Sequence, residues 1–338
     1  MKLTRVTSKV VEQGVKATVF IPTYNGEKYI GKILKAVFNQ VIDFGYEVLI
    51  IDSGSTDKTL QIIKEYQGDH KNLSLEEIPN SEFGHGKTRN YAAHQAKGEI
   101  VVYLSHDAIP SHNRWLYEIT KPFGLNDKIM GVTGKQIPRH KCVPLLKYEI
   151  KNAFRNLGPD FGTTMFYKDD FMKNPVYNDG VGFYSDVNSA TRRDFLVNTI
   201  PYRDVPYAED QLFGRDLIEA GYYKAYAPRA SVIHSNDLLL REYKHRIFDE
   251  MVGLRRIGVK IRIPSVKSII KSVVIGVIKD GVRTVFDEHY SFKRKVYWLT
   301  INPLYHIAKW RGVRLAAKAD IKDGDLIKKH SLESKRKK

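Results

Sequence analysis

The chain has 338 residues, 42% of them hydrophobic and 11% aromatic, which allows a buried core and excludes a disordered tail protein and a coiled coil. Cys142 is the only cysteine, so an internal disulfide is excluded, a cysteine-based zinc site is disfavoured, and a reducing cytoplasm is the expected location. The net charge of +17 is concentrated in residues 241–338, which hold 25 basic and 10 acidic residues, against 30 and 28 in residues 1–240. We therefore expect a near-neutral globular domain over 1–240 and a basic helical region over 241–338.

Short β-rich runs alternate with helical patterns through the first part of the chain. This alternation is typical of α/β proteins with a mostly parallel central sheet. Apolar residues at helical spacing predict helices over 28–40, 56–66 and 208–220. Strands are predicted at 17–22, 47–52, 73–78, 100–104, 129–134, 222–227 and 231–234.

The remaining segments differ in composition and periodicity from this α/β pattern. Residues 135–205 are irregular and rich in Tyr, Phe, Asn, Asp and Gly, as substrate-contacting loops often are. Lys- and Arg-punctuated helices are predicted over 238–257, 265–287 and 292–310, and the charged residues 328–338 are expected to be frayed. The first residues lack the apolar stretch of a secretory signal, and no segment is expected to span a bilayer.

Polar side chains follow the first two predicted strands. In an open α/β sheet ligands bind beyond the carboxyl ends of the strands, so two such turns on neighbouring strands favour a nucleotide pocket. The alternatives are an ordinary turn with Asn25 as a cap and helix capping by Ser55 or Thr56. The candidate residues at these two turns are Pro22, Thr23, Tyr24, Asn25, Asp52 and Ser53.

A third polar turn covers residues 82–90. Its Gly-Lys-Thr sequence is not a P-loop, because Ser81 stands where that motif needs glycine. Cations and backbone N–H groups at a helix start favour an anion such as a diphosphate, and a solvated basic helix start is the alternative. The candidate residues here are His85, Gly86, Lys87, Arg89 and Asn90.

Carboxylates follow the fourth strand and open the 208–220 helix. Asp107 has the hard oxygen ligands that hold Mg²⁺ or Mn²⁺ against a diphosphate, although an aspartate after a strand is also a common cap. Glu209 and Asp210 offer carboxylates that can act as a general base. Two acids also favour a helix start in the absence of any chemistry.

Seven short motifs between residues 17 and 236 resemble, in order, those of the inverting nucleotide-sugar glycosyltransferases of family 2, and within them the bacterial rhamnosyltransferases. The motifs are Ile-Pro-Thr-Tyr-Asn, Asp-Ser-Gly-Ser-Thr-Asp, Phe-Gly-His-Gly-Lys-Thr-Arg-Asn, Ser-His-Asp-Ala, Ser-Asp-Val-Asn-Ser-Ala-Thr-Arg-Arg, Ala-Glu-Asp-Gln and Val-Ile-His-Ser. The resemblance implies the GT-A fold. It also implies donor binding by the residues of the three polar turns together with His106.

The resemblance further implies roles for individual residues. Asp107 is assigned to the metal and diphosphate and His234 to the metal shell, although Ser105 replaces the first aspartate of the family's D-x-D element. Asp210 is assigned as the catalytic base, with Glu209 orienting the acceptor. The residues expected between donor and acceptor, with the arginines near the diphosphate, are Asn188, Ser189, Arg192 and Arg193.

The competing interpretations of these residues stay open. His234 is also explained as a satisfied histidine at a strand end, and one of the two arginines as an ion-pair partner of Asp194 or Asp186.

The basic region has three interpretations. Nucleic-acid binding is disfavoured because no recognisable module accompanies the charge. Residues 265–287 mix apolar and basic side chains in an imperfect amphipathic pattern, which suits a helix on an anionic membrane surface. The same helices also suit a small bundle or a homodimer interface.

The expected function is transfer of L-rhamnose from dTDP-β-L-rhamnose to a cell-envelope glycan acceptor at the inner face of the plasma membrane. The acceptor would be a lipid-linked rhamnan, an O-antigen-type polysaccharide or a teichoic acid. The alternatives are transfer from another nucleotide sugar and a non-catalytic scaffold that binds nucleotides or polyanions.

Overall fold

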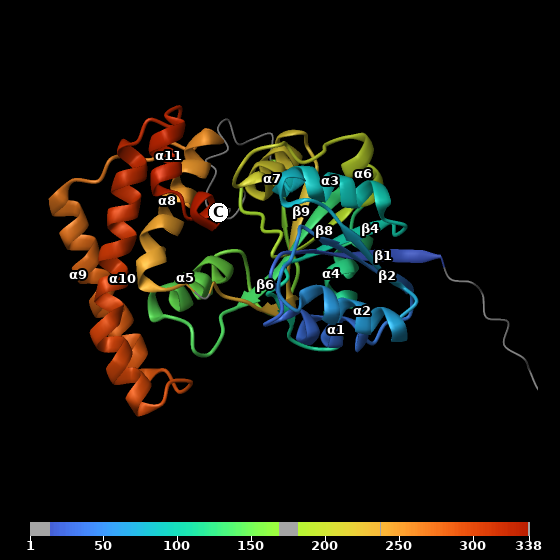
Figure 1. The fold of residues 1–338 in the computed structure, drawn as a ribbon, viewed down its shortest axis with the longest axis horizontal. Helices are drawn as coiled ribbons and strands as arrows, with labels where there is room; N and C mark the ends of the chain where they lie inside the picture. Colours follow the sequence, from blue (N-terminus) through green and yellow to red (C-terminus); the bar gives the residue numbers. More distant parts are fainter. Residues whose placement is uncertain (1–13, 169–181, 237, 337–338) are drawn as a thin grey trace, which may run out of the picture.

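A nine-stranded sheet forms the centre of the molecule in a computed structural model that describes residues 14–168, 182–236 and 238–336 (Figure 1). The strand order is β3-β2-β1-β4-β8-β6-β9-β5, and β7 pairs with β9. The strands are β1 (Val15–Thr23), β2 (Gly45–Asp52), β3 (Leu73–Glu77), β4 (Ile100–Leu104), β5 (Ile109–Pro110), β6 (Ile129–Ile137), β7 (Thr164–Phe166), β8 (Asn188–Arg192) and β9 (Tyr223–Ile233).

The sheet is mixed. Strands β3, β2, β1 and β4 are parallel, as are β6 and β9. Strand β8 runs antiparallel between β4 and β6, and β5 and β7 run antiparallel to β9. The predicted α/β class is confirmed, and the two separate runs predicted at 222–227 and 231–234 form the single strand β9.

Alternating residues of the central strands build one apolar layer on each face of the sheet. Val19 and Ile21 of β1 point to the face covered by α1 (Ile30–Phe38), α2 (Thr59–Asp69) and α4 (Trp115–Thr120). Phe20 points to the face covered by α3 (His85–Gln95), α6 (Arg193–Asn198) and α7 (Glu209–Glu219) (Figure 1). This period of two is what a strand buried on both faces requires. Two short 3₁₀ turns cover Asn80–Glu82 and Lys121–Gly124.

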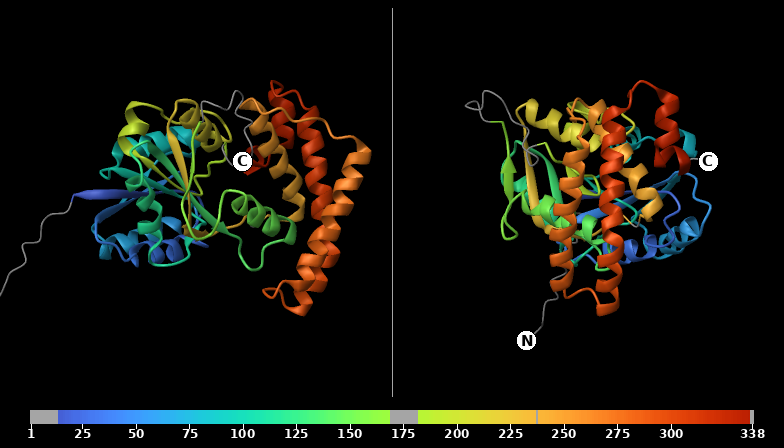
Figure 2. Two further views of the ribbon diagram at one scale, coloured as in Figure 1. Left: turned by 180° about the vertical axis from the view of Figure 1, so that it is seen from behind. Right: turned by 90° about the vertical axis from the view of Figure 1, so that its left-hand side faces the viewer.

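A helical region packs beside the sheet. It contains α5 (Pro144–Arg155), α8 (Leu240–Arg256), α9 (Val266–Phe286), α10 (Phe292–Lys318), α11 (Gly324–His330) and α12 (Leu332–Arg336). Helix α10 contacts both α8 and α9, and α9 and α10 lie side by side at the outer surface (Figure 2). Tyr243, Trp298 and Tyr305 belong to the apolar cluster that joins α5, α8 and α10. Within the described part of the chain, no helix combines the length and apolar character that crossing a bilayer requires.

Three sequence expectations need correction. Residues 135–205 contain α5 and β8 as well as loops, and the helix predicted at 292–310 continues to Lys318. The expectation of frayed residues at 328–338 is wrong for those that the structure describes, because α11 and α12 extend through them. Leu332 is buried, and the Asp249 carboxylate accepts hydrogen bonds from the backbone N–H groups of Leu332 and Glu333, at 2.8 and 3.2 Å, which caps α12.

Candidate active site

The turn after β2 is held together by the carboxylate of Asp52, which is fully buried. Its Oδ2 accepts hydrogen bonds from the hydroxyls of Thr23, at 2.9 Å, and Ser55, at 2.6 Å. Its Oδ1 accepts from the backbone N–H groups of Gly54, at 3.0 Å, and Ser55, at 2.8 Å. The side chain predicted to meet the nucleotide therefore uses its oxygens to join the ends of β1 and β2. The backbone N–H of Ser53 completes this join by donating to the carbonyl of Thr23 at 2.9 Å.

The other residues predicted in these turns lie closer to the surface. Tyr24 is 38% exposed, whereas Pro22 is half-buried within β1. Asn25 adopts a left-handed conformation with φ of 48°, and its side-chain oxygen accepts from the N–H of Thr56 at 2.9 Å. The ring of His106 packs over this turn, since a Cβ added to Gly26 would lie 3.3 Å from it. Exposed Tyr24 thus remains available to a ligand at the rim.

A cavity of about 450 Å³ lies between the sheet and the helical region. Asp107 and His234 line it from the carboxyl ends of the sheet strands, and Glu209 and Asp210 line it from the start of α7. Asp52 is not among its lining residues. Asp107 and Asp210 therefore line one cavity, while Asp52 supports the neighbouring turn.

Asp107 and His234 form a pair at the sheet side of the cavity. Nε2 of His234 lies 3.4 Å from Oδ1 of Asp107, and Nδ1 lies 2.9 Å from Oε1 of Gln136. Because a carboxamide oxygen only accepts hydrogen bonds, Nδ1 carries a proton that it donates to Gln136, and Nε2 is the ring nitrogen that faces Asp107. The pKa of Asp107 is lowered, since His234, His106 and Arg139 outweigh the effect of burial. A carboxylate and an imidazole nitrogen facing each other in this way fit a divalent cation.

Arg139 is a site residue that the sequence did not reveal. It hydrogen-bonds the backbone carbonyls of Asp107 and Ser235, and its guanidinium lies 4.2 Å from the ring centroid of Tyr29. Arg139 thereby joins the segment after β4 to the segment after β9. No local motif surrounds it, so only the fold brings it to Asp107.

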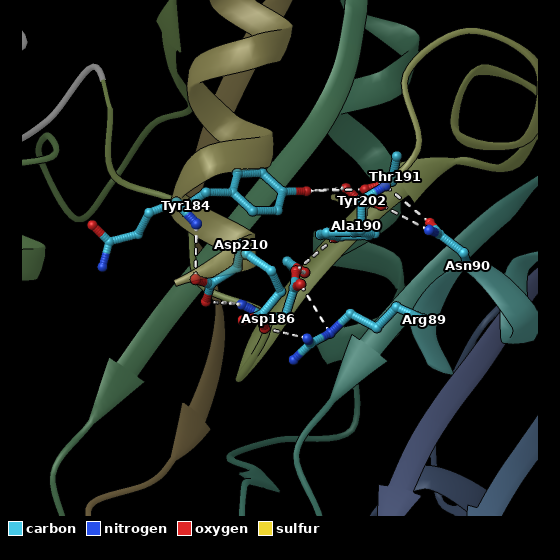
Figure 3. A network of polar contacts seen from close by, with 11 residues as sticks. Arg89, Asn90, Tyr184, Asp186, Ala190, Thr191, Tyr202 and Asp210 are labelled. Carbon is cyan, nitrogen blue, oxygen red and sulfur yellow. Dashed lines mark hydrogen bonds and ion pairs between the residues drawn. The ribbon is translucent and has the colours of Figure 1, made fainter. Parts of the chain in front are cut away.

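Three carboxylates gather at the start of α7. Ligand atoms of Asp186, Glu209 and Asp210 all lie within 4.8 Å of one another. Arg89 binds two of them, with its Nε 3.0 Å from Oδ2 of Asp186 and its Nη1 hydrogen-bonded to Glu209 (Figure 3 shows Arg89 beside Asp186 and Asp210). The Arg89 guanidinium balances the negative charges of Asp186 and Glu209. The cluster is therefore a poor site for a metal ion, because two of its three carboxylates are already ion-paired. Asp210 has no ion pair to Arg89 and faces the cavity.

Burial and neighbouring charges shift the pKa values of the two acids of α7 in opposite directions. Burial, together with Glu209 and Asp186, raises the pKa of Asp210 to about 8. Burial also favours the neutral form of Glu209, but Arg89 and His85 lower its pKa below the usual range. Ala208, directly before them, has a left-handed φ of 62°, a conformation that costs a non-glycine residue about 1 kcal/mol or more. Asp210 therefore has the pKa of a base suited to near-neutral pH, while Glu209 stays ionised.

The first turns of α3, which contain residues 85–90, contact the segment that precedes α7. A Cβ on Gly86 would lie 2.4 Å from the carbonyl oxygen of Arg203, so only glycine permits this approach. The Asn90 side chain donates to the carbonyl of Tyr202 at 2.8 Å and accepts from its N–H at 2.9 Å (Figure 3). Lys87 is exposed, and burial lowers the pKa of His85, which lines the cavity. Gly86 and Asn90 thus pack against residues 202–203, and Arg89 binds Glu209. Their expected role beside a diphosphate stays a prediction.

Strand β8 also differs from its expected role. Asn188 is fully buried, where it accepts from Trp115 and donates to the carbonyl of Ala230 at 2.7 Å. Ser189 is equally buried, and its hydroxyl donates to Asp186 at 2.5 Å. Both residues support the site from beneath it.

The expectation for Arg192 and Arg193 needs correction. Arg192 pairs with Ile100, at the opposite end of β4 from the segment that carries Asp107. Its guanidinium donates to the carbonyls of Ile129 and Phe123, and Arg193 donates to the carbonyl of Ala93. Neither arginine lines the cavity, so neither is placed to meet a diphosphate there.

Asp186 is the other residue that sequence reasoning left out of the site. Its Oδ1 accepts from Tyr202 at 3.0 Å as well as from Ser189, and the carboxylate is buried. The available signal was a charged residue within the Ser-Asp-Val-Asn motif, directly before a buried strand.

Comparison with known proteins decides the family. Residues 18–198, more than half of the chain, match the model described as Glycosyl transferase family 2. The chain belongs to glycosyl transferase family 2. The O-antigen chain rhamnosyltransferase WbaN of Salmonella anatum is 34% identical over 238 residues, which cover 69% of this chain and 70% of WbaN. The chain is therefore a glycosyltransferase, as the motifs indicated.

Two solved structures of this glycosyltransferase class share the fold. The mannosyltransferase PcManGT of Pyrobaculum calidifontis, in complex with GDP-Man and Mn²⁺, has a TM-score of 0.56 at 18% identity and covers 94% of this chain and 92% of its own. TarS 1-349 of Staphylococcus aureus, in complex with UDP-GlcNAc, has a TM-score of 0.51 at 19% identity and covers 94% and 79%. The predicted GT-A fold is confirmed.

TarS is also a relative in sequence. It is named a poly(ribitol-phosphate) β-N-acetylglucosaminyltransferase, and it is 41% identical over 96 residues, which are 28% of this chain and 16% of TarS.

Proposed function

We propose that this glycosyltransferase moves L-rhamnose from dTDP-β-L-rhamnose to a hydroxyl of a cell-envelope glycan, with inversion at the anomeric carbon. The observation that carries the proposal is that Asp210, a carboxylate with a raised pKa, lines one cavity with Asp107 and His234. The choice of rhamnose is supported by the 34% identity to WbaN. Another nucleotide sugar is the competing donor, because the fold is shared with enzymes crystallised with GDP-Man and UDP-GlcNAc.

Asp210 acts as the general base in this proposal. The acceptor hydroxyl gives its proton to an Asp210 carboxylate oxygen while its own oxygen forms the new bond to the anomeric carbon. The bond from that carbon to the diphosphate oxygen breaks, and the leaving nucleoside diphosphate keeps the electron pair. Arg89 and Glu209 fix the start of α7, so that Asp210 faces the acceptor without rearrangement.

Asp107 and His234 would hold a divalent cation, Mg²⁺ or Mn²⁺. Gln136 sets the imidazole so that Nε2 faces the Asp107 carboxylate. When bound, the cation supplies positive charge to the departing diphosphate. Ser105, which replaces the first aspartate of the D-x-D element, lines the same cavity with its smaller hydroxyl side chain. Asp107 and His234 are thus the protein groups proposed to bind the cation.

Donor hydrolysis tests this function without knowledge of the acceptor. The purified protein is incubated with dTDP-rhamnose, UDP-GlcNAc, UDP-glucose or GDP-mannose, each with Mg²⁺ or Mn²⁺, and released nucleoside diphosphate is measured. We expect release from dTDP-rhamnose to be fastest. Faster release from another donor would reassign the sugar. No release from any donor would favour the alternative interpretation, a non-catalytic scaffold.

We also propose that α9 and α10 rest on an anionic membrane surface. Exposed apolar residues follow α9 at intervals of four, namely Val266, Ile270, Val274, Ile278, Val282 and Phe286. Phe292 and Val296 of α10 are exposed apolar residues as well. The two helices contain four and seven Lys or Arg residues, and their single acidic residue, Asp280, is buried. Apolar and basic side chains on one outer layer suit an anionic interface, whereas a homodimer through it would bring like charges together.

Vesicle flotation tests the membrane proposal. The protein should float with vesicles containing phosphatidylglycerol and remain at the bottom with pure phosphatidylcholine. Replacing Lys267, Lys271 and Lys279 together by Glu should abolish flotation. The matched control replaces three exposed lysines near the sheet, Lys32, Lys35 and Lys71, by Glu and should float normally. Equal loss in both variants, or a dimer that dissociates only in the first, would contradict the proposal.

A further inference from the structure

The cavity extends from Asp210 into the helical region, where α5 and α8 form a wall. Glu149 and Ile150 line it from α5, and Tyr243, Arg246 and Glu250 line it from α8. The three residues of α8 lie outside the segment matched by the family model, whereas the two of α5 lie within it. The basic C-terminal region therefore completes the cavity as well as carrying the outer helices.

The polar groups of this wall are one buried hydroxyl, that of Tyr243, and the half-buried side chains of Glu149, Arg246 and Glu250. Tyr243 is 1% exposed, and among the described residues its hydroxyl has no hydrogen-bond partner. Glu250 carries a raised pKa because it is partly buried and because Glu149 is close, although Arg246 opposes both effects. Buried polar groups are normally hydrogen-bonded, so an unsatisfied hydroxyl beside carboxylates marks a place where a polar ligand fits.

The charges of the wall decide which ligand it suits. Four carboxylates line this part of the cavity, from Glu149, Glu250 and Glu333 in addition to Asp210. Lys309 is ion-paired with Glu149, so the carboxylates still outnumber the two cations, Lys309 and Arg246. Arg246 is the single arginine of the wall, and its guanidinium stacks 5.0 Å from the Tyr207 ring and 3.9 Å from Oε1 of Glu333. A phosphate group here would face these carboxylates, whereas sugar hydroxyls would donate hydrogen bonds to them.

We propose that the α5–α8 wall is the acceptor subsite and that it accepts an uncharged, hydroxyl-rich sugar rather than a phosphate-bearing polyol. Carboxylate oxygens of Glu149 and Glu250 accept from the sugar hydroxyls, Tyr243 supplies a donor, and the ring of Tyr207 covers an apolar sugar face. The proposal rests on the glycosyl transfer proposed above and separates two acceptor classes. Of the relatives, WbaN is named for an O-antigen chain and TarS for poly(ribitol phosphate).

The test compares two kinds of acceptor with the full-length protein and dTDP-rhamnose. One is a panel of methyl glycosides of neutral hexoses and 6-deoxyhexoses, and the other is a ribitol 5-phosphate oligomer. Rhamnosylated products are quantified by mass spectrometry, and KM is measured for acceptor and donor separately. We expect transfer to at least one neutral glycoside with a kcat/KM at least tenfold above that of the ribitol phosphate oligomer.

Two variants test the wall itself. Glu250→Gln should raise the KM for the neutral acceptor about tenfold, since a hydrogen bond to a charged group is lost, while the donor KM changes less than twofold. Glu149→Gln combined with Glu250→Gln should raise the relative use of the ribitol phosphate oligomer about tenfold, which a merely structural role would not do. Glu288→Gln, the same change at an exposed position outside the cavity, is the control.

Each outcome bears on the proposal. An unchanged acceptor KM in Glu250→Gln, or preferred use of the ribitol phosphate oligomer by the unmodified protein, overturns it. Neutral glycosides that neither accept sugar nor inhibit donor hydrolysis also overturn it. A protein that hydrolyses no nucleotide sugar fails at the earlier step, so that the proposed function is then lost rather than the acceptor class alone.

Discussion

The backbone N–H of Asp186 donates a hydrogen bond to Oδ2 of Asp210 over 3.2 Å. The backbone N–H of Asp186 therefore stabilises the ionised form of Asp210, whereas the negative charge of the Asp186 carboxylate destabilises it. The balance, with burial as the largest contribution, leaves the pKa of Asp210 at about 8. A base of this strength stays protonated in much of the free protein at neutral pH.

The pH dependence of activity follows from this pKa. Transfer needs the ionised Asp210, so kcat/KM should rise with pH and level off above about pH 8. Asp210→Asn should lower kcat about 10²- to 10⁴-fold, the usual contribution of a general base. Donor affinity, measured by thermal shift with dTDP-rhamnose, should persist. A variant that keeps half of the kcat of the unmodified enzyme would remove Asp210 from this role.

The stability of the protein should also depend on Asp210. Its pKa is raised on folding, so between about pH 4 and pH 8 the folded state keeps a proton that the unfolded chain releases. This contribution to the free energy of unfolding is complete below about pH 4 and is lost as pH rises to about 8. Urea denaturation across this range should show a smaller decline for Asp210→Asn than for the unmodified protein. Parallel declines would show that Asp210 does not titrate in this way.

Arg89 should be essential for stability as well as for the site. Removing its guanidinium leaves two buried carboxylates, Asp186 and Glu209, without their cation. Breaking a buried ion pair from one side costs about 3–5 kcal/mol, so Arg89→Met should lower the free energy of unfolding by that amount. Lys87→Met, on the same helix but exposed, should change it by less than about 0.5 kcal/mol. Equal effects of the two substitutions in urea denaturation would contradict the assignment.

Gln136 should control metal affinity without touching the metal. It fixes the proton of His234 on Nδ1, and loss of such a partner typically lowers metal affinity about 10- to 100-fold. We expect Gln136→Leu to weaken Mn²⁺ binding in calorimetry by this factor and His234→Asn to weaken it further. His94→Asn, on the exposed side of α3, is the control and should bind Mn²⁺ normally. Unchanged affinity in both Gln136→Leu and His234→Asn would place the cation elsewhere.

Local patterns predicted most of the central sheet. The alternation of buried residues on β1 and β4, such as Val19 with Phe20, is a direct consequence of burial on both faces, and it is visible in the sequence as continuous apolar runs. The short strand β8 was not predicted, because three of its five residues are Asn188, Ser189 and Thr191, polar side chains that tertiary hydrogen bonds satisfy. Propensity alone gives no sign of such partners.

The site was predicted in its residue types more than in its contacts. Asp107 and His234 stand at the ends of predicted strands, and Asp210 stands at the start of a predicted helix. The three side chains line one cavity. Arg89 and Asn90 stand in a turn that reads as an anion site, yet their partners, Glu209 and Tyr202, lie more than a hundred residues along the chain. A cation and a carboxylate so far apart in sequence give no local signal that they will neutralise each other.

Helix α12 brings the C-terminal end of the chain to the site. Glu333 lines both the main cavity and a second cavity of about 390 Å³ beside it, and Asp249 secures the start of α12 from α8. Loss of the cap that Asp249 provides would consequently displace Glu333 from both cavities at once.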